Sequence, residues 1–552
     1  MTRSTNANDT LGAMLGDLAR RRGSAPAFIG EGETISYAAF DGASRRLAQG
    51  LWELGIRAGD SVALWLPNGP EWLALHFACA RLGAVTVVVN TKFRVTEVED
   101  LLARSKARLL VCWPHFKGID FLGILREIDP LAVTALKAVI VCGDETRPPE
   151  RTLERATLPY RALTVKRPFD DDHAAPEAGA ILFTTSGTTS ASKLVLQTHG
   201  AITRHARAVA ERFGYTSPDC RLLQLLPFCG VFGYSAAIAA IVAGRALVIR
   251  PSFRAEEAAK LIAQHGITHM IGSDEMFRRI LSFGEGERPF PRWRFAGFAA
   301  FNPSITDLVS AGEERGICFY GLYGSSELLA LFAAQAPDAR PEVRAQAGGF
   351  TVSPEARARA REPASGRILP PGETGELELK GPSLMAGYLG DPDATRDALT
   401  EDGYLRTGDL GYVRSDGGFV FLARAGEFLR LGGFLVNPRE IEDFIQSHES
   451  IEGCQVVSGA EGTRPVAFVT LVKASALDEP ALRAHCLKGI AKYKVPERFV
   501  ALDAFPTTQS ANGIKIQRHR LREQAEAILE SDKARSRRTR AARDQSAPLP
   551  RS

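Results

Sequence analysis

A hydroxyl-rich loop that follows an apolar strand is the strongest chemical signal in the sequence. The segment Ile181–Lys193 reads ILFTTSGTTSASK. Backbone N–H groups freed by Gly187, together with the hydroxyls, can hold phosphate oxygens, while Lys193 supplies positive charge. The Walker order G-x-x-x-x-G-K-[ST] is missing from it. The segment therefore predicts a phosphate site of another kind, and the alternative is a Ser/Thr-rich surface turn.

Further polar segments follow this loop in a fixed order. They read LYGSSE at Leu322–Glu327, YLRTGDLG at Tyr404–Gly411, AR at Ala423–Arg424, GFLVNPREIE at Gly433–Glu442 and NGIKIQR at Asn512–Arg518. With the hydroxyl-rich loop, they resemble motifs of the acyl-adenylating superfamily of acyl-CoA synthetases, peptide-synthetase adenylation domains and beetle luciferases. The resemblance covers about Leu11 to Glu523, because the amino-terminal LPNGPE and RLGAVTVVVN segments are also similar to this family.

The resemblance implies that the chain binds ATP and Mg²⁺. Adenylation requires cations and oriented donors between a carboxylate and a triphosphate, two anions that repel each other. The residues that match the phosphate-binding positions are Thr185, Ser186, Gly187, Thr188, Thr189 and Lys193. Glu327 and Thr188 match the Mg²⁺-binding positions, and a hard carboxylate oxygen suits that ion. Ser326, with Gly324 beside it, is expected to donate to the α-phosphate.

The adenosine part of ATP is expected to meet a second set of residues. Asp409 would accept two hydrogen bonds from the ribose hydroxyls, because a carboxylate only accepts, and Arg424 would reach the same sugar. By the same resemblance, Tyr323 stacks on adenine and the backbone around Gly297 and Ala299 borders it. A turn aspartate without a ligand is the alternative for Asp409 alone.

The resemblance assigns catalysis to Lys515, with Glu327 and Lys193 as catalytic partners. Lys515 would stand between the incoming carboxylate and the α-phosphate and offset the charge of the transition state. In this family the small domain then rotates about a hinge and forms a tunnel for the pantetheine arm of coenzyme A. Gly426 falls at the hinge, where glycine eases the pivot. Arg430, Gly432 and Gly433 match the coenzyme A side of the tunnel.

The segment LPFCGVFG at Leu226–Gly233 departs from the family text, because Gly230 stands where the family has a gating histidine. By alignment, the residues that line the acid pocket are Phe228, Cys229, Gly230, Phe232, Ser235 and Phe298. They carry no charge, and no aspartate is found near Gly233 to pair an amino group. The lining therefore favours an aromatic, alicyclic or medium-chain aliphatic acid over an amino acid. A stand-alone enzyme that loads a carrier protein is the alternative to a coenzyme A ligase.

The elements that must position these residues follow an α/β pattern. Helical and strand segments alternate from Ser36 to about Ile249, which predicts largely parallel sheets covered by helices. Short strands and glycine turns begin at Gly372. The expected fold is a large N-terminal domain of stacked βαβ sheets with a β-rich subdomain, then a small mobile α+β C-terminal domain. Its expected limits are 1–424, 425–523 and a basic, disordered tail at 524–552.

The length and composition are typical of a soluble enzyme that has more than one hydrophobic core. The chain has 552 residues, 45% of them hydrophobic and 24% charged, and a formal net charge of +4. Its eight cysteines show no C-x-x-C spacing, and no apolar run of 18 residues predicts a membrane span. The polar start gives no secretion signal, so we expect a cytoplasmic location. The acid, the pathway and the oligomeric state stay open, a homodimer included.

The arginine-rich tail motivates one interpretation of another class. Arg535, Arg537, Arg538, Arg540 and Arg543 lie close together in sequence, as in segments that contact nucleic acid or anionic lipid. A nucleotide-binding regulatory or nucleic-acid-interacting protein would share this feature. It would not explain why Asp409, Arg424 and Lys515 all occur in family order, so we expect no nucleic-acid partner.

Overall fold

The structure is a computed structural model that divides into two compact units. It describes residues 9–143, 148–185, 192–301, 305, 307–363, 365–425, 429–431, 434–459, 464–473, 475–490, 492–510 and 513–545. The large unit comprises residues 1–300, 307–407 and 412–421, and the small unit comprises residues 301–306, 408–411 and 422–552. The main segment of the small unit thus begins at residue 422, three residues before the start at residue 425 expected from the sequence. The small unit also takes in residues 408–411.

A nine-stranded sheet carries the hydroxyl-rich loop. Its strands, in spatial order, are β22 (Gly387–Tyr388), β12 (Leu194–Thr198), β11 (Gly179–Thr184), β4 (Val85–Val88), β3 (Ser61–Trp65), β5 (Leu109–Cys112), β8 (Ala138–Val141), β10 (Arg155–Pro159) and β9 (Arg151–Thr152). The strands from β11 to β10 run parallel, whereas β12, β22 and β9 pair antiparallel with their neighbours. The central strands are apolar throughout because helices cover both faces of a parallel sheet.

A thirteen-stranded sheet carries the other large-unit motifs. Its strands, in spatial order, are β2 (Thr34–Ser36), β1 (Pro26–Ile29), β14 (Ala246–Ile249), β13 (Arg221–Gln224), β15 (His269–Ser273), β16 (Phe295–Ala299), β17 (Phe319–Tyr323), β18 (Ala333–Ala334), β19 (Gly348–Thr351), β24 (Phe419–Arg424), β23 (Leu405–Val413), β21 (Gly375–Lys380) and β20 (Arg357–Arg361). It is parallel from β1 to β17 and turns antiparallel at β18. The β-rich part expected from Gly372 onward is thus an extension of this sheet. A separate hairpin joins β6 (His115–Phe116) to β7 (Ile119–Asp120).

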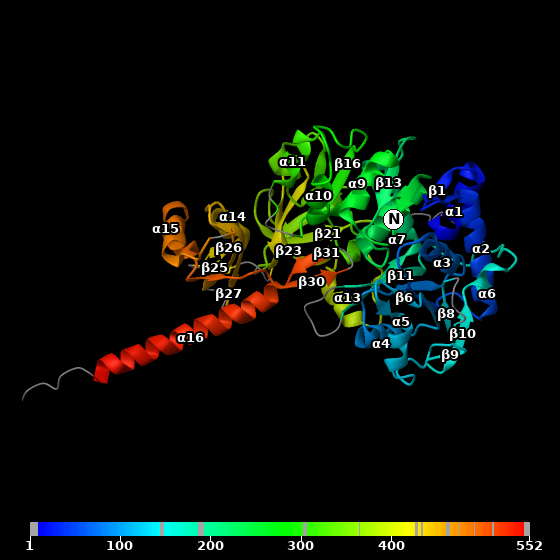
Figure 1. Ribbon diagram of the computed structural model, residues 1–552, viewed down its shortest axis with the longest axis horizontal. Helices are drawn as coiled ribbons and strands as arrows, with labels where there is room; N and C mark the ends of the chain where they lie inside the picture. Colours follow the sequence, from blue (N-terminus) through cyan, green and yellow to red (C-terminus); the bar gives the residue numbers. More distant parts are fainter. Residues whose placement is uncertain are drawn as a thin grey trace, which may run out of the picture. The chain divides into compact units, whose positions relative to one another are not determined.

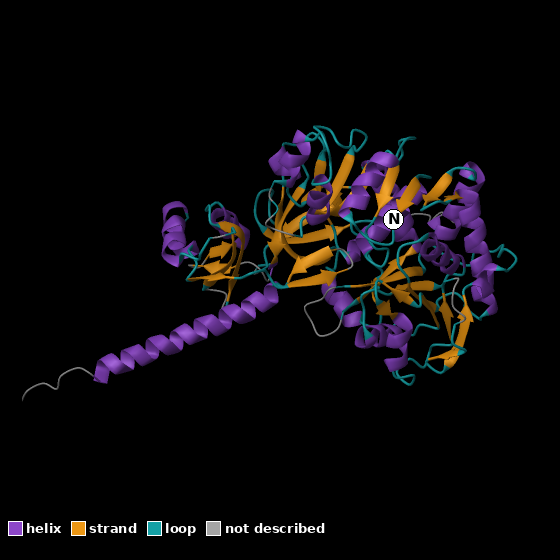
Figure 2. Ribbon diagram, viewed as in Figure 1, coloured by secondary structure: helices purple, strands orange, loops and turns teal. Residues whose placement is uncertain are grey.

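Helices of the large unit alternate with the strands, as Figure 2 shows. They are α1 (Leu11–Arg22), α2 (Tyr37–Glu53), α3 (Pro70–Arg81), α4 (Val95–Arg104), α5 (Phe121–Glu127), α6 (Arg161–Thr164), α7 (His199–Arg212), α8 (Val231–Val242), α9 (Ala255–Gln264), α10 (Asp274–Leu281), α11 (Leu308–Glu314), α12 (Pro341–Arg344), α13 (Pro392–Ala398) and the 3₁₀ turn η2 (Ser326–Leu328). Thr10, Ser36 and Thr198 cap α1, α2 and α7 by accepting a backbone N–H two or three residues into the helix. Strand–helix alternation confirms the predicted fold class.

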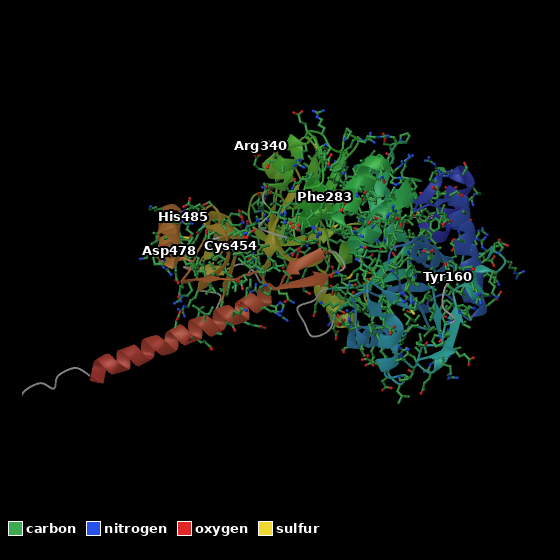
Figure 3. The ribbon with its side chains drawn as sticks, viewed as in Figure 1. Tyr160, Phe283, Arg340, Cys454, Asp478 and His485 are labelled. Atoms are coloured by element: carbon green, nitrogen blue, oxygen red, sulfur yellow. The ribbon has the colours of Figure 1, made fainter. Side chains whose placement is uncertain are left out.

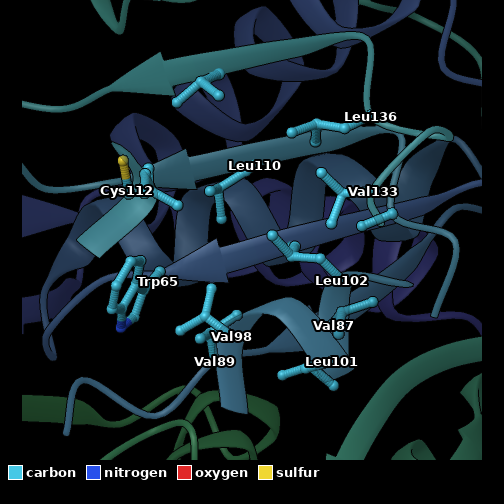
Figure 4. Close-up of a cluster of buried hydrophobic side chains, with 14 of the residues drawn as sticks. Trp65, Val87, Val89, Val98, Leu101, Leu102, Leu110, Cys112, Val133 and Leu136 are labelled. Carbon is cyan, nitrogen blue, oxygen red and sulfur yellow. The ribbon is translucent and has the colours of Figure 1, made fainter. Parts of the chain in front are cut away.

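The core under the nine-stranded sheet is fully apolar. Trp65, Val87 and Leu110 from three neighbouring strands meet Val98 and Leu102 from α4 (Figure 4), and all five are at most 1% exposed. A buried side chain of this size stabilises the fold by about 1.5 to 3 kcal/mol relative to exposure. This core fixes β11 and β12, and therefore the base of the hydroxyl-rich loop.

The small unit has its own α+β core. Its elements are the hairpin β25 (Leu429–Leu431) and β26 (Phe434–Val436), α14 (Pro438–Gln446), the sheet of β27 (Ile451–Ser458), β28 (Pro465–Leu471) and β29 (Arg498–Ala501), α15 (Glu479–Gly489), η4 (Lys492–Lys494), the hairpin β30 (Thr507–Ser510) and β31 (Gly513–Ile516), and α16 (Arg518–Gln545). Cys454 lies within it (Figure 3) and is completely buried. Arg518 donates to Glu442, 2.9 Å away, and to the carbonyl oxygen of Val456. This contact ties the start of α16 to α14 and β27.

The helix α16 differs from the disordered tail that we expected at 524–552. It continues to Gln545 (Figure 1). Its first part is held by Leu521, Ala525 and Leu529, which repeat every fourth residue and pack in one cluster with Val457 and Phe468. No glycine or proline interrupts residues 518–545. None of the helices that the structure describes is both long and apolar enough to span a membrane.

Candidate active site

The base of the hydroxyl-rich loop is closed by two backbone contacts. Strands β11 and β12 pair antiparallel up to Thr184 and Leu194. Beyond them, the Thr185 N–H donates to the Lys193 carbonyl at 3.0 Å, and the Lys193 N–H donates to Thr185 Oγ1 at 3.2 Å. Lys193 is therefore fixed at the end of a sheet strand. The loop residues predicted to hold phosphate, Ser186, Gly187, Thr188 and Thr189, lie outside the described residues.

Glu327 lies in the 3₁₀ turn that follows β17. Its carbonyl accepts the Met385 N–H at 2.8 Å, and the carbonyl of Ser326 accepts Nε2 of Gln197 at 2.9 Å. Gly324 begins the turn, and a Cβ there would lie 2.6 Å from the backbone of Ala330, so only glycine fits. The turn is thus tied to two other segments of the large unit.

Tyr388 joins Glu327 to Lys193, and it was not among the residues predicted for the site. Its hydroxyl donates to Glu327 Oε1 at 3.0 Å, and Nζ of Lys193 lies 4.6 Å from the centre of its ring. Lys193 directly precedes β12, Glu327 lies in η2 and Tyr388 in β22, so the structure brings two of the predicted catalytic residues together. The sequence feature that could have pointed to Tyr388 is its type, an aromatic residue with a hydroxyl, in the short strand Gly387–Tyr388.

A divalent cation fits this group of residues. Ser325, two residues before Glu327, has a buried Oγ with no hydrogen-bond partner among the described residues. The described residues contain no cluster of three or more His, Cys, Asp or Glu that could enclose a metal alone. A single carboxylate suits Mg²⁺, which is commonly held by one or two carboxylates together with substrate phosphates. Thr188, the other predicted ligand, lies outside the described residues.

The residues predicted to contact adenine lie at the carboxyl ends of β16 and β17. Tyr323 ends β17, is 7% exposed, and contacts the rings of Phe419 and Phe421 with centroids 5.2 and 5.7 Å away. Gly297 lies inside the sheet opposite Tyr320, whereas Ala299 lies at the strand end and is half-buried. Ligands of parallel α/β sheets bind at such carboxyl ends. Tyr323 and Ala299 fit that place better than Gly297.

Asp409 and Arg424 form an ion pair. Arg424 Nε lies 3.1 Å from Asp409 Oδ1, and the aspartate side chain is 7% exposed while that of the arginine is 59% exposed. Gly408 precedes Asp409 with φ +67, a left-handed conformation that favours glycine. The structure therefore brings together the two residues predicted for the ribose, as a buried acceptor beside an exposed donor.

The predicted acid-pocket residues lie at the start of α8, except for Phe298, which lies in β16. Phe228, Cys229, Phe232, Ser235 and Phe298 are all less than 8% exposed, and Gly230 caps the helix. Asn68, which we did not select, fixes this segment by donating to the Leu226 carbonyl and accepting the Phe228 N–H, both at 2.8 Å. Cys229 is a neutral thiol, because burial raises its pKa to about 11.

Two of these residues, Phe298 and Ser235, also make contacts that stabilise the surrounding fold. Phe298 packs against Phe319 with centroids 6.4 Å apart. Ser235 Oγ donates to the Leu329 carbonyl at 2.6 Å, and Leu329, Ala330 and Leu331 have φ values of +59, +49 and +41. Left-handed non-glycine residues cost roughly 1 to 2 kcal/mol each, so Ser235 stabilises a strained turn.

The remaining predicted residues belong to the small unit. Lys515 lies in β31, opposite Thr508 of β30, and the position of its side chain is not described. Arg430 lies in β25, where only its backbone is described. Gly426, Gly432 and Gly433 lie outside the described residues.

Comparison with known proteins identifies the family. The model of the AMP-binding enzyme family matches residues 16–389, and that of the AMP-binding enzyme C-terminal domain matches residues 440–512. Sulfoacetate–CoA ligase of Cupriavidus necator is 30% identical over 93% of this chain and 97% of its own length. The 2-succinylbenzoate–CoA ligase of Geobacillus kaustophilus is 32% identical over 87% of this chain and 90% of its own.

A solved structure has the same fold. MatB from Rhodopseudomonas palustris, bound to ATP, superposes with a TM-score of 0.80 at 23% identity, covering 95% of this chain and all of that one. The chain therefore belongs to the AMP-binding enzyme family. The predictions of an acyl-adenylating fold and of an enzyme in the acid–thiol ligase class are confirmed.

Proposed function

We propose that the chain is an ATP-dependent carboxylic acid:CoA ligase. In the first step a carboxylate oxygen attacks the α-phosphorus of ATP, which gives acyl-AMP and releases pyrophosphate. In the second step the thiol sulfur of coenzyme A attacks the acyl carbon, so that AMP leaves and acyl-CoA forms. The observation that carries the proposal is the group of Lys193, Tyr388 and Glu327 within a chain of this family.

The large unit supplies the charges that the first step needs. Lys193 offers an ammonium to the phosphates, and Glu327 is the carboxylate for Mg²⁺, which when bound neutralises phosphate charge. Ser326 lies in the same turn and carries the hydroxyl proposed for the α-phosphate. Preorganised charges of this kind stabilise a transition state without reorganising during the reaction.

The small unit supplies the adenylation lysine and the ribose contacts in this proposal. Asp409 offers a carboxylate to the ribose hydroxyls and Arg424 a guanidinium, in both steps. Lys515 bridges the attacking carboxylate and the α-phosphate in the first step only. Arg430, Gly432 and Gly433 border the pantetheine arm in the second. We retain residues 1–424 and 425–523 as functional domains on this basis.

Coenzyme A is the acceptor in this proposal. The names of the relatives support it, since both enzymes compared above are named as CoA ligases. An enzyme that loads a carrier protein is the alternative.

For the acid, we propose an aromatic, alicyclic or medium-chain aliphatic acid. The support is the apolar wall of Phe228, Phe232 and Phe298, which would leave a charged group unpaired. The printed names of the relatives include sulfoacetate and 2-succinylbenzoate, and they point to no single acid.

The test uses the purified chain with ATP, Mg²⁺ and a panel of acids, with pyrophosphate release as the first readout and thioester formation from free coenzyme A as the second. We expect both with at least one apolar acid. Pyrophosphate release without a coenzyme A thioester would favour the carrier-protein alternative. Release with none of the acids would contradict the proposal.

A further inference from the structure

The strand β22 fixes Tyr388 beside the phosphate loop. Val195 pairs with Tyr388 and Leu196 with Gly387. The Leu389 N–H donates to the Leu194 carbonyl at 2.8 Å, which holds the same register on the other side. Side chains on one face of a sheet meet directly opposite and diagonally, at two residues along the strand. Lys193 is two residues before Val195, so this register makes it the diagonal neighbour of Tyr388.

The backbone of Tyr388 is also held from the side of α13. Its N–H donates to Thr395 Oγ1 at 2.9 Å, and Thr395 in turn donates to the Asp391 carbonyl at 2.9 Å. The tyrosine is 8% exposed and packs in a cluster with Val195, Leu328 and Met385. Its ring position is therefore set by the fold and not by Lys193 or Glu327.

The tyrosine separates two opposite charges. Among the described residues, Lys193 has no carboxylate within 4.0 Å, and Glu327 likewise has no cation within that distance, so the two do not form an ion pair. The ammonium instead faces the tyrosine ring, and the carboxylate accepts from the tyrosine hydroxyl. Each charge thus has a partner that is neutral and that a phosphate or a metal ion can replace.

We propose that Tyr388 is a positioning residue of the adenylation site, which holds Lys193 and Glu327 apart and aims each at the triphosphate. The inference rests on the proposed function. The hydroxyl orients the Glu327 carboxylate for the divalent cation, while the ring face keeps the Lys193 ammonium available for phosphate oxygens. Without the tyrosine, the two charges would pair with each other, and ATP and Mg²⁺ would have to break that pair.

Two substitutions separate the two contacts. Tyr388→Phe removes the hydroxyl and keeps the ring, so we expect the affinity for Mg²⁺ in the presence of ATP to fall about tenfold. ATP binding measured in EDTA should stay unchanged. Tyr388→Leu removes both contacts, so ATP binding in EDTA should also fall by about the same factor. Calorimetric titration with ATP, with and without Mg²⁺, and Mn²⁺ titration followed by electron paramagnetic resonance measure both effects without turnover.

The matched control is Tyr404→Phe. Tyr404 also lies under a cation, with the Arg359 guanidinium 3.8 Å from its ring centre, but Arg359 is paired with Asp402 and is not a predicted site residue. We expect no change in either titration. A general loss of stability would lower the melting temperature of Tyr388→Phe and weaken both titrations equally, and that result would overturn the positioning role.

Glu327→Gln, measured in parallel, separates this inference from the proposed function. If Glu327→Gln weakens Mg²⁺ binding and Tyr388→Phe does not, the positioning role is wrong and the proposed function stands. If neither substitution affects Mg²⁺ binding, the assignment of Glu327 fails as well. If both do, and the double variant is no worse than Glu327→Gln alone, the hydroxyl acts through Glu327 as proposed.

Discussion

Lys193 in the large unit and Lys515 in the small unit are both proposed to meet the phosphates of ATP, but their supports differ. Lys193 directly precedes β12 of the nine-stranded sheet and is hydrogen-bonded through its own N–H and carbonyl to Thr185. Lys515 lies on the two-stranded hairpin of β30 and β31. A two-stranded hairpin is marginal by itself, whereas a strand in a large sheet is held on both sides.

The difference suits two different tasks. A group that binds the triphosphate gains from a rigid sheet, since preorganised contacts need no ordering when the ligand binds. A group needed for one half-reaction only can sit on an element that moves with a separate unit. The comparison therefore predicts that Lys193 contributes mainly to ATP affinity and that Lys515 contributes to the rate of adenylation.

The largest expected effect comes from Lys515→Ala. Removal of one ammonium between two anions should slow adenylation by roughly a hundredfold or more. Supplied acyl-adenylate should still be converted to acyl-CoA at a near-normal rate, because the lysine serves only the first step. Both steps are measured on one preparation. A variant equally defective in both steps would contradict the assignment of Lys515 to adenylation alone.

Substitutions in the phosphate loop test the large-unit lysine. Lys193→Ala should weaken ATP binding by roughly tenfold to a hundredfold, because loss of a charged contact typically costs about 1.5 to 3 kcal/mol. Ser190→Ala is the matched loop variant and should have little effect, since water can replace a lost hydroxyl. Equal losses in the two variants would argue against Lys193 as a phosphate ligand.

Asp409→Ala should weaken binding of the adenosine part by about tenfold, in adenylation and in thioester formation alike. The ribose is held in both steps, so the effect should extend to both, unlike that of Lys515→Ala, although both residues belong to the small unit. The apparent affinities for ATP and for acyl-adenylate provide the measurement. A loss confined to one step would exclude the ribose role.

Acid should destabilise the large unit through its buried histidines. Burial lowers the pKa of His76 to about 3, and its ring lies 2.9 Å from both Thr86 Oγ1 and the Tyr234 hydroxyl. An unfolded histidine titrates near 6.5, so the unfolded chain binds more protons between these values. The free energy of unfolding is therefore highest above about pH 6.5. It falls on acidification, by at most about 1.4 kcal/mol per pH unit for this group.

His76→Asn should remove that part of the pH dependence, measured as the difference between urea midpoints at pH 7 and pH 5. An unchanged pH dependence in the variant would show that His76 is not the responsible group.

The smallest effect concerns the acid pocket. Gly230→His should narrow the range of acids that are adenylated and leave ATP affinity unchanged, because Gly230 begins α8 next to Cys229 and is not near the predicted phosphate residues in sequence. Pyrophosphate release with the acid panel measures the range. An identical acid profile would show that Gly230 does not border the acid.

The local parts of the site could be predicted from the sequence. The strands on either side of the hydroxyl-rich loop and the turn that contains Glu327 are local features. Each is encoded by a short segment in which an apolar run borders small and polar residues. The expected tail begins at residue 524, whereas α16 continues to Gln545. Ala525 and Leu529, together with Leu521 just before the expected limit, pack in the small-unit core, and this periodic apolar pattern favours a helix despite the basic composition.

Amino-acid sequence alone determined the family and the chemical types of the site, since the order of the motifs and the absence of charge around Phe228 are properties of the chain. Only the tertiary structure decided that Tyr388 separates Lys193 from Glu327, that Ser235 holds the Leu329 turn, and that Asp409 pairs with Arg424. Tyr388 is 61 residues from Glu327 along the chain, and the register of β22 on β12 brings them together. Register depends on which strands pair, and no local segment encodes that choice.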